Sequence, residues 1–174
     1  MNKKSYISLA NKAANIQINE LKKIKKIFNN TFIEAVDLIL NCKGKVIFAG
    51  IGKSGLIARK ISATFSSVGI PSFFCDPAQA LHGDMGQIEK KDILIIFSYS
   101  GNTSELTNML KYANRYRIKI IGVASKPESI LLKASDIKLI LPRVKEADVT
   151  GMVPTTSTTI TLLLGDCSAT TVMH

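Results

Sequence analysis

The sequence predicts a doubly wound α/β fold in three layers, with a five-stranded parallel sheet and two helices ahead of it. Five short, almost continuously apolar segments alternate with segments of helical periodicity. Strands of this kind are buried on both faces, as in a parallel sheet between two layers of helices. The 174 residues contain no repeat or linker. We therefore expect one domain, with N-terminal helices over residues 1–42, a core over residues 43–174 and a C-terminal helix that is cut short.

The first 42 residues are expected to form two helices. Apolar residues recur at roughly helical spacing over residues 5–28, which predicts one long helix. Thr31 precedes a second apolar run and is expected to cap the next helix. Lysines alternate with apolar residues over residues 22–26, which is typical of the solvated face of an amphipathic helix.

The predicted strands cover residues 45–49, 71–75, 93–97, 118–123 and 137–141. Helical segments are expected over residues 56–68 and from residue 106 to 112, and a last helix begins in the hydroxyl cluster at 155–159. In open parallel sheets, ligands bind outside the carboxyl ends of the strands. The segments that follow the strands are therefore the places where functional residues are expected.

Composition narrows the function classes. The net charge of +10 comes mostly from the lysines of the first 30 residues, and aromatic residues are not interleaved with them, so no platform for nucleic-acid bases is visible. No stretch approaches the ~20 apolar residues of a membrane span, and the N-terminus has no signal-peptide core. The three cysteines form neither a zinc pattern nor a disulfide framework. We expect a cytoplasmic protein without nucleic-acid or membrane partners, whose charge favours anionic small ligands.

The hydroxyl-rich turn after the third predicted strand is the most informative segment. It contains Ser98, Ser100, Gly101, Asn102 and Thr103. Hydroxyl donors at the start of a helix, where backbone N–H groups are free and the dipole is positive, suit a phosphate monoester. Asn102 and Glu105 also fit a helix capping box, which needs no ligand; both interpretations are compatible.

The turn after the first predicted strand carries Gly50, Gly52, Lys53, Ser54 and Gly55. The pattern lacks the first glycine of a P-loop, but it contains the three glycines of a dinucleotide fingerprint. Asp76, after the second strand, could supply the acidic residue of such a site. NAD binding and a plain tight turn both remain alternatives to a phosphosugar site.

Two other segments carry groups of acid–base or oxyanion-binding type. His82 precedes Gly83 and Asp84 after the second strand, so it is either an acid–base group or a structural histidine. Glu146 follows the fifth strand, where spacing alone favours a solvated loop. The hydroxyl cluster after Pro154 can cap the last helix or bind an oxyanion.

Taken together, these motifs resemble the sugar isomerase (SIS) domain of the D-arabinose-5-phosphate isomerase family, a flavodoxin-like fold. The matching patterns are G-x-G-K-S-G at 50–55, P-S-F-F at 71–74, H-G-D at 82–84, S-x-S-G-x-T-S-E at 98–105, V-K-E-A at 144–147 and P-T-T-S-T-T at 154–159. The resemblance implies interconversion of D-ribulose 5-phosphate and D-arabinose 5-phosphate through a cis-enediol, for synthesis of the Kdo sugar of lipopolysaccharide. It implies no cofactor, and a homo-oligomer, expected to be a tetramer.

The resemblance also implies roles for individual residues. Lys53, Glu105 and Glu146 match positions of catalytic relevance, with one of the two carboxylates as the base and Lys53 stabilising the enediolate or the phosphate. The residues expected to bind substrate are Gly52, Ser54, Gly69, His82, Ser98, Ser100, Gly101, Asn102, Thr103, Thr155, Thr156 and Ser157.

Three departures from the family pattern keep alternatives open. The family carries CBS domains after the sugar-binding domain, and it carries a catalytic histidine beyond the last helix; neither occurs in these 174 residues, and the role of that histidine is not transferred to His174. A zinc-associated histidine of the family falls on Asp76, which alone does not predict a metal site. The alternatives are a non-catalytic sugar-phosphate-binding module or truncated remnant, and a 6-phospho-3-hexuloisomerase.

Overall fold

The computed structural model describes residues 3–173 and confirms the α/β fold with an all-parallel sheet; His174 lies outside the described residues. The five strands are β1 (Val46–Gly50), β2 (Ser72–Cys75), β3 (Ile93–Phe97), β4 (Lys119–Ala124) and β5 (Ile137–Ile140). They lie in the order β2-β1-β3-β4-β5, and every neighbouring pair is parallel. This is the order of a flavodoxin-like fold, which the resemblance to the SIS domain implies.

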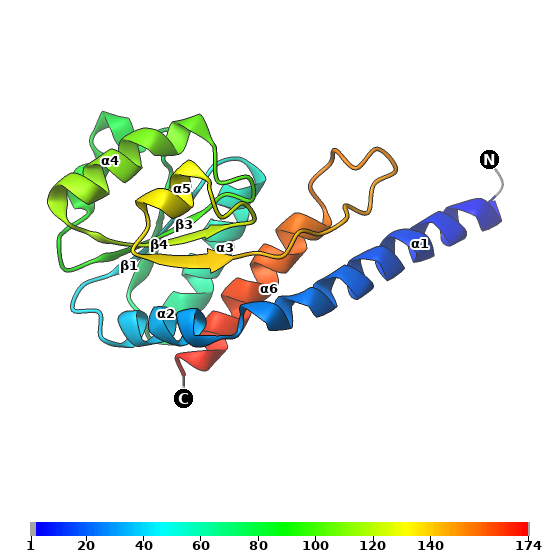
Figure 1. Ribbon diagram of the computed structural model, residues 1–174, viewed down its shortest axis with the longest axis horizontal. Helices are drawn as coiled ribbons and strands as arrows, with labels where there is room; N and C mark the ends of the chain where they lie inside the picture. The colour runs from blue at the N-terminus through cyan, green and yellow to red at the C-terminus, as the bar shows by residue number, and fades with distance from the viewer. Residues whose placement is uncertain (1–2, 174) are drawn as a thin grey trace.

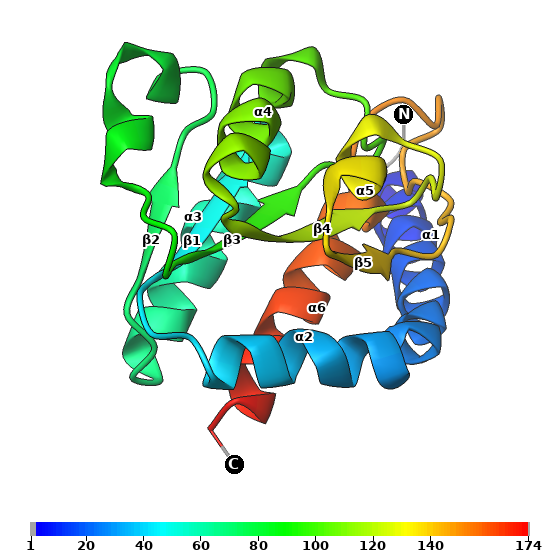
Figure 2. The same ribbon diagram turned by 60° about the vertical axis from the view of Figure 1, so that its left-hand side comes forward.

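Helices cover both faces of the sheet (Figures 1 and 2). The helices are α1 (Lys3–Leu21), α2 (Asn30–Leu40), α3 (Lys53–Ser67), α4 (Thr107–Tyr116), α5 (Ile130–Ala134) and α6 (Thr156–Thr171). Helices α2, α3 and α6 pack on one face, and α4 and α5 on the other. Val46 and Phe48 of β1 belong to the first core, whereas Ile47 and Ala49 belong to the second. Residues of β3 and β4 are divided between the two cores in the same way, so both sides of the central strands are apolar, which explains their continuous apolar runs in the sequence.

Helix α1 packs against α6 and extends beyond the body of the molecule (Figure 1). Within the part of the chain that the structure describes, no helix is both long enough and apolar enough to span a bilayer.

Two expectations for the N-terminal segment were wrong. The predicted single helix over 5–28 ends at Leu21 and continues as a 3-10 helix over Lys22–Ile27. A 3-10 helix has three residues per turn, so Ile24 and Ile27 share one buried face while the lysines stay outside. The cap of α2 is Asn29 rather than Thr31: the Asn29 side chain accepts a hydrogen bond from Thr31 N at 2.9 Å.

The strand order reverses between β1 and β3, because the chain first adds β2 on one side of β1 and then places β3 on the other. The segments that leave β1 and β3 diverge at this point and open a crevice at the carboxyl edge of the sheet. The glycine-rich turn at residues 50–55 and the hydroxyl-rich turn at residues 98–105 are those two segments.

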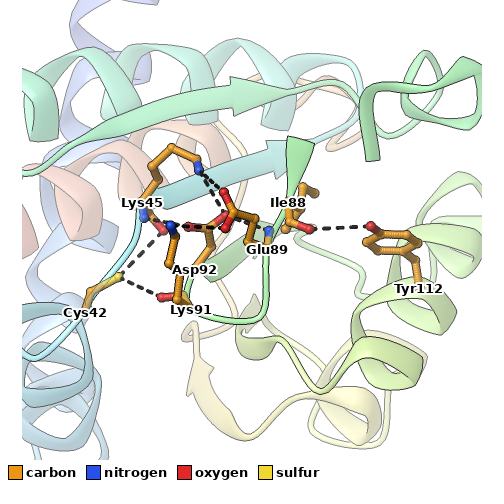
Figure 3. A network of polar contacts seen from close by, with 7 residues as sticks. All are labelled: Cys42, Lys45, Ile88, Glu89, Lys91, Asp92 and Tyr112. Atoms are coloured by element: carbon orange, nitrogen blue, oxygen red, sulfur yellow. Dashed lines mark hydrogen bonds and ion pairs between the residues drawn. The ribbon is translucent and has the colours of Figure 1, made fainter. Parts of the chain in front are cut away.

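At the opposite edge, one buried carboxylate joins the beginnings of β1 and β3 (Figure 3). Asp92 is only 1% exposed, and its carboxylate accepts hydrogen bonds from Lys45 N at 2.7 Å and Glu89 N at 2.8 Å. The Lys45 ammonium lies 3.3 Å from the same carboxylate. A buried charge that is paired and hydrogen-bonded in this way sets the spacing of the two strands that flank the crevice.

Replacing Asp92 with alanine should lower the free energy of unfolding by about 3 kcal/mol, because two backbone N–H groups and an ammonium lose their buried acceptor. Urea unfolding followed by circular dichroism measures the change. Asp37→Ala, on the exposed side of α2, is the control and should stay within about 0.5 kcal/mol of the wild type. Equal losses in the two variants would contradict this role of Asp92.

Candidate active site

A cavity of about 540 Å³ lies at the carboxyl edge of the sheet. Its volume falls in the range of about 300–1,000 Å³ that is usual for small-molecule sites. Three parts of the chain form its wall: the start of α3, the turn after β3, and the segment from β5 into α6. The lining residues are Ile51, Lys53, Ser54, Ile57, Ser98, Tyr99, Ser100, Thr103, Val144, Glu146, Gly151, Met152, Pro154, Ser157, Thr158 and Thr161.

The turn after β3 is folded back on itself by its own hydroxyl groups. Ser98 Oγ lies 2.8 Å from Thr103 Oγ1 and accepts a hydrogen bond from Gly101 N at 3.1 Å. Gly101 has a φ of +69°, and a Cβ at this position would overlap the side chain of Ser129. The shape of the turn is therefore held by its own residues, with the hydroxyl-bearing Ser100 and Thr103 in the cavity wall.

The capping box expected from Asn102 and Glu105 does not form. Asn102 Oδ1 instead accepts a hydrogen bond from Ile130 N at 3.0 Å, at the start of α5. Glu105 Oε2 accepts a hydrogen bond from the Ser104 hydroxyl at 2.8 Å, which holds the pKa of that carboxyl below its ordinary value. The tight turn directs Asn102 toward the free N–H groups of a neighbouring helix rather than its own. Glu105 is exposed and is not part of the cavity wall.

Glu146, by contrast, lies in the cavity wall at the beginning of α6. Its Oε2 accepts hydrogen bonds from Thr155 N at 2.8 Å, Thr155 Oγ1 at 3.0 Å and Ser157 N at 3.3 Å. Burial raises the pKa of Glu146, but hydrogen bonds from Ser157 and Thr155 outweigh it, so the pKa lies below its ordinary value. Glu146 is thus an ionised, half-buried and well-held carboxylate, not a solvated loop residue.

The start of α3 brings positive charge to the cavity. Gly52 adopts a φ of +58° and turns the chain into the helix, whose first residues are Lys53 and Ser54. Within residues 3–173, the Lys53 ammonium has no ion-pair partner. An unpaired ammonium beside a helix N-terminus favours an anionic ligand.

The structure places the other predicted substrate residues in different surroundings. Thr155 bonds to Glu146 and also accepts a hydrogen bond from Ala147 N at 2.9 Å; Thr156 is fully buried; Ser157 lines the cavity. His82 is exposed on a 3-10 turn after β2, outside the cavity wall. Gly69 lies between α3 and β2, at the amino edge of the sheet.

Asp76, considered as a zinc ligand or a ribose ligand, accepts a hydrogen bond from Ala78 N at 2.9 Å. Among residues 3–173, no group of three or more His, Cys, Asp or Glu side chains is arranged to hold a metal ion.

Tyr99 is a cavity residue that sequence reasoning missed. Its hydroxyl donates a hydrogen bond to Pro142 O at 3.2 Å and accepts one from Val144 N at 2.9 Å. Burial, the largest influence, raises the pKa of this phenol. The only signal in the sequence is an aromatic residue between Ser98 and Ser100, and its partners lie more than forty residues away.

Comparison with known proteins points to one family. A family model described as a SIS domain matches residues 39–171. An arabinose 5-phosphate isomerase KdsD of Escherichia coli (strain K12) is 42% identical over 149 residues, which are 86% of this chain and 45% of that protein. The chain spans about half the length of the curated relatives it matches.

Two solved structures are similar over nearly the whole chain. A protein of Escherichia coli CFT073 in complex with arabinose 5-phosphate is 34% identical, with a TM-score of 0.95, and the match covers 99% of this chain and 92% of that one. A putative sugar-phosphate isomerase from Listeria monocytogenes is 30% identical, with a TM-score of 0.96, and the match covers 99% and 91% of the two chains.

Replacing Gly101 with alanine should lower the free energy of unfolding by about 2 kcal/mol, since a left-handed conformation is costly for alanine and the added Cβ meets Ser129. Urea unfolding measures the loss. Gly86→Ala is the matched control, because a Cβ at that position has no neighbour within 4 Å. A loss at Gly86 as large as the loss at Gly101 would contradict the explanation.

The hydrogen bonds at Glu146 predict a pH-dependent contribution to stability. A carboxyl whose pKa is lowered by folding stabilises the protein above its unfolded pKa of about 4.3, and this contribution disappears as the pH falls through the folded pKa. The difference in unfolding free energy between the wild type and Glu146→Gln should therefore shrink as the pH is lowered from about 6 toward 3. Urea unfolding at several pH values tests this, and a constant difference would contradict it.

Proposed function

The chain belongs to the SIS domain family, and on that premise we propose that it is an aldose–ketose isomerase that interconverts D-ribulose 5-phosphate and D-arabinose 5-phosphate through a cis-enediol. The observation that carries the proposal is that one cavity brings together an ionised carboxylate, an unpaired ammonium and a hydroxyl-rich turn. The hydroxyl-rich turn suits a phosphate, and the ammonium suits the negative charge of a developing enediolate. The carboxylate can remove the proton of an acidic C–H bond.

The phosphate is assigned to the turn after β3, where Ser100 and Thr103 carry the donor hydroxyls. Gly101, with its positive φ, gives this turn its tight bend, and the N-terminus of α3 adds its dipole. The similar E. coli chain in complex with arabinose 5-phosphate supports sugar-phosphate binding by this fold, because nearly all of that chain is matched here.

Proton transfer is assigned to Glu146. The hydrogen bonds from Thr155 and from Ser157 N go to Oε2, and we assign Oε1 as the oxygen that takes the proton from C1 of ribulose 5-phosphate. The electrons form the C1–C2 double bond, and O2 takes a proton from solvent, which gives the cis-enediol. Glu146 then returns its proton to C2 while O1 releases its proton to solvent, which leaves the aldehyde of arabinose 5-phosphate and an ionised Glu146.

The lowered pKa keeps Glu146 ionised but makes it a weak base, so the enediolate must be stabilised in another way. Lys53 is the cation in the same cavity, and we assign it to the developing charge on the enediolate or to the phosphate. Glu105 and His82 lie outside this cavity wall. We propose that they approach the substrate when the site closes or when subunits meet.

Turnover tests the proposal directly. Purified protein should convert ribulose 5-phosphate to arabinose 5-phosphate faster than it isomerises fructose 6-phosphate or sedoheptulose 7-phosphate. Glu146→Gln should lose at least ~10²-fold in kcat, as expected for a general base. Glu34→Gln, exposed on α2, is the matched control and should keep wild-type activity.

Glu105→Gln distinguishes the two candidate bases: a loss larger than that of Glu146→Gln would transfer the role to Glu105. Retained sugar-phosphate binding without turnover by the wild type would contradict the isomerase and leave a non-catalytic sugar-phosphate-binding module. Preference for a 3-hexulose 6-phosphate would favour a 6-phospho-3-hexuloisomerase.

The cellular setting is part of the same proposal. We place the enzyme in the cytoplasm as a homotetramer, where its product would enter Kdo and lipopolysaccharide synthesis. Light scattering of the purified protein would test the assembly state.

A further inference from the structure

The segment between β5 and α6 carries Glu146, but it has no regular secondary structure of its own. Around Glu146 its backbone N–H groups are bound instead by side chains, two of which come from distant parts of the fold. Val144 N donates to Tyr99, Lys145 N donates to Glu20, and Ala147 N donates to Thr155. Three amides within two residues of Glu146 are thus held from three places: the turn after β3, α1 and the N-cap of α6.

Tyr99 holds the segment from the side of the phosphate turn. Its hydroxyl binds Pro142 O and Val144 N, the backbone groups on either side of Arg143. The backbone of Tyr99 is itself fixed, because its carbonyl oxygen accepts hydrogen bonds from Ser125 N at 2.9 Å and Ser125 Oγ at 2.8 Å. Tyr99 therefore connects the end of β4, through its backbone, with the segment that carries Glu146, through its hydroxyl group.

Glu20 holds the segment from the side of α1. Its Oε2 accepts a hydrogen bond from Lys145 N at 2.9 Å and pairs with the Lys23 ammonium at 2.5 Å. Hydrogen bonds from Lys23 and from Lys145 N lower the pKa of Glu20, which is therefore ionised at neutral pH. Helix α1 is in turn bound to α6, because the Thr159 hydroxyl donates to Gln17 Oε1 at 3.0 Å.

We propose that Tyr99 and Glu20 are positioning residues for Glu146: they hold residues 142–145 from two sides and so fix where the Glu146 carboxylate lies in the cavity. Neither residue takes part in proton transfer. A carboxylate displaced by about 1 Å loses on the order of 10²-fold in rate, so small movements of this segment matter. The catalytic part of the inference rests on the proposed isomerase function, whereas the positioning of the carboxylate does not.

The central variant is Tyr99→Phe, which removes the hydroxyl and keeps the ring. Its matched control is Tyr112→Phe, which also removes a phenol bonded to a backbone carbonyl (Ile88 O, at 3.4 Å; Figure 3) but lies outside the cavity wall. We expect Tyr99→Phe to lower kcat for ribulose 5-phosphate by about 10- to 50-fold with KM within about 3-fold of the wild type. If the Tyr99 hydroxyl mattered only for folding, Tyr99→Phe would lower the amount of folded enzyme, as Tyr112→Phe would, and would leave kcat unchanged.

Glu20 supplies a second test through a conservative replacement. Glu20→Ala removes the acceptor of Lys145 N and should lower kcat, whereas Glu20→Gln keeps an oxygen at that place and should recover most of the loss. Failure of glutamine to improve on alanine would contradict a role as hydrogen-bond acceptor.

A readout that needs no turnover separates this inference from the proposed function. In protein labelled with ¹³C at the glutamate carboxyl groups, Glu146 should titrate below its ordinary pKa, and Tyr99→Phe should raise that value as the bonds at Thr155 and Ser157 loosen. An unchanged titration in Tyr99→Phe would overturn the inference, as would a variant in which KM rises and kcat does not fall. An inactive wild type would overturn only the proposed function, and the titration would still decide the positioning role.

Discussion

The cavity depends on the hydrogen bonds that Glu146 Oε2 accepts at the beginning of α6. A helix N-terminus has free N–H groups and a positive dipole end, and a carboxylate satisfies both. In this chain the carboxylate comes from the segment after β5. It accepts hydrogen bonds from the N-terminus of α6, holds that segment against the helix and remains in the cavity wall. The same bonds keep Glu146 ionised and limit its basicity, which explains why a nearby cation such as Lys53 matters for the proposed chemistry.

The polar side chains at the two edges of the sheet have different roles. At the amino edge, Asp92 is completely enclosed and binds the backbone where β1 and β3 begin. At the carboxyl edge, Ser98 and Thr103 shape the turn that follows β3. Both carry polar side chains that satisfy backbone groups, and the cavity lined by Lys53, Ser100 and Glu146 lies at the carboxyl edge. The buried carboxylate thus lies where the strands start, and the candidate chemistry lies where they end.

Much of the site could be predicted from local sequence, because its residues lie in short motifs directly after buried strands. Lys53, Ser98 and Ser100 are such residues, and they line the cavity. The choice between Glu105 and Glu146 could not be made in this way. Both follow strands, but Glu105 is exposed after the tight turn that follows β3, whereas Glu146 accepts hydrogen bonds at the start of α6 and is half-buried.

By itself the sequence determined the apolar strands, their alternation with helices and the hydroxyl-rich turn, because these follow from residue type and from spacing along a few neighbouring residues. Tertiary structure alone decided that Tyr99 reaches Val144 and that Glu20 reaches Lys145. These pairs are separated by 45 and 125 residues, and a hydrogen bond depends on a fit of a few tenths of an ångström. No local pattern encodes such a fit; it arises only when the sheet order and the packing of α1 on α6 bring the groups together.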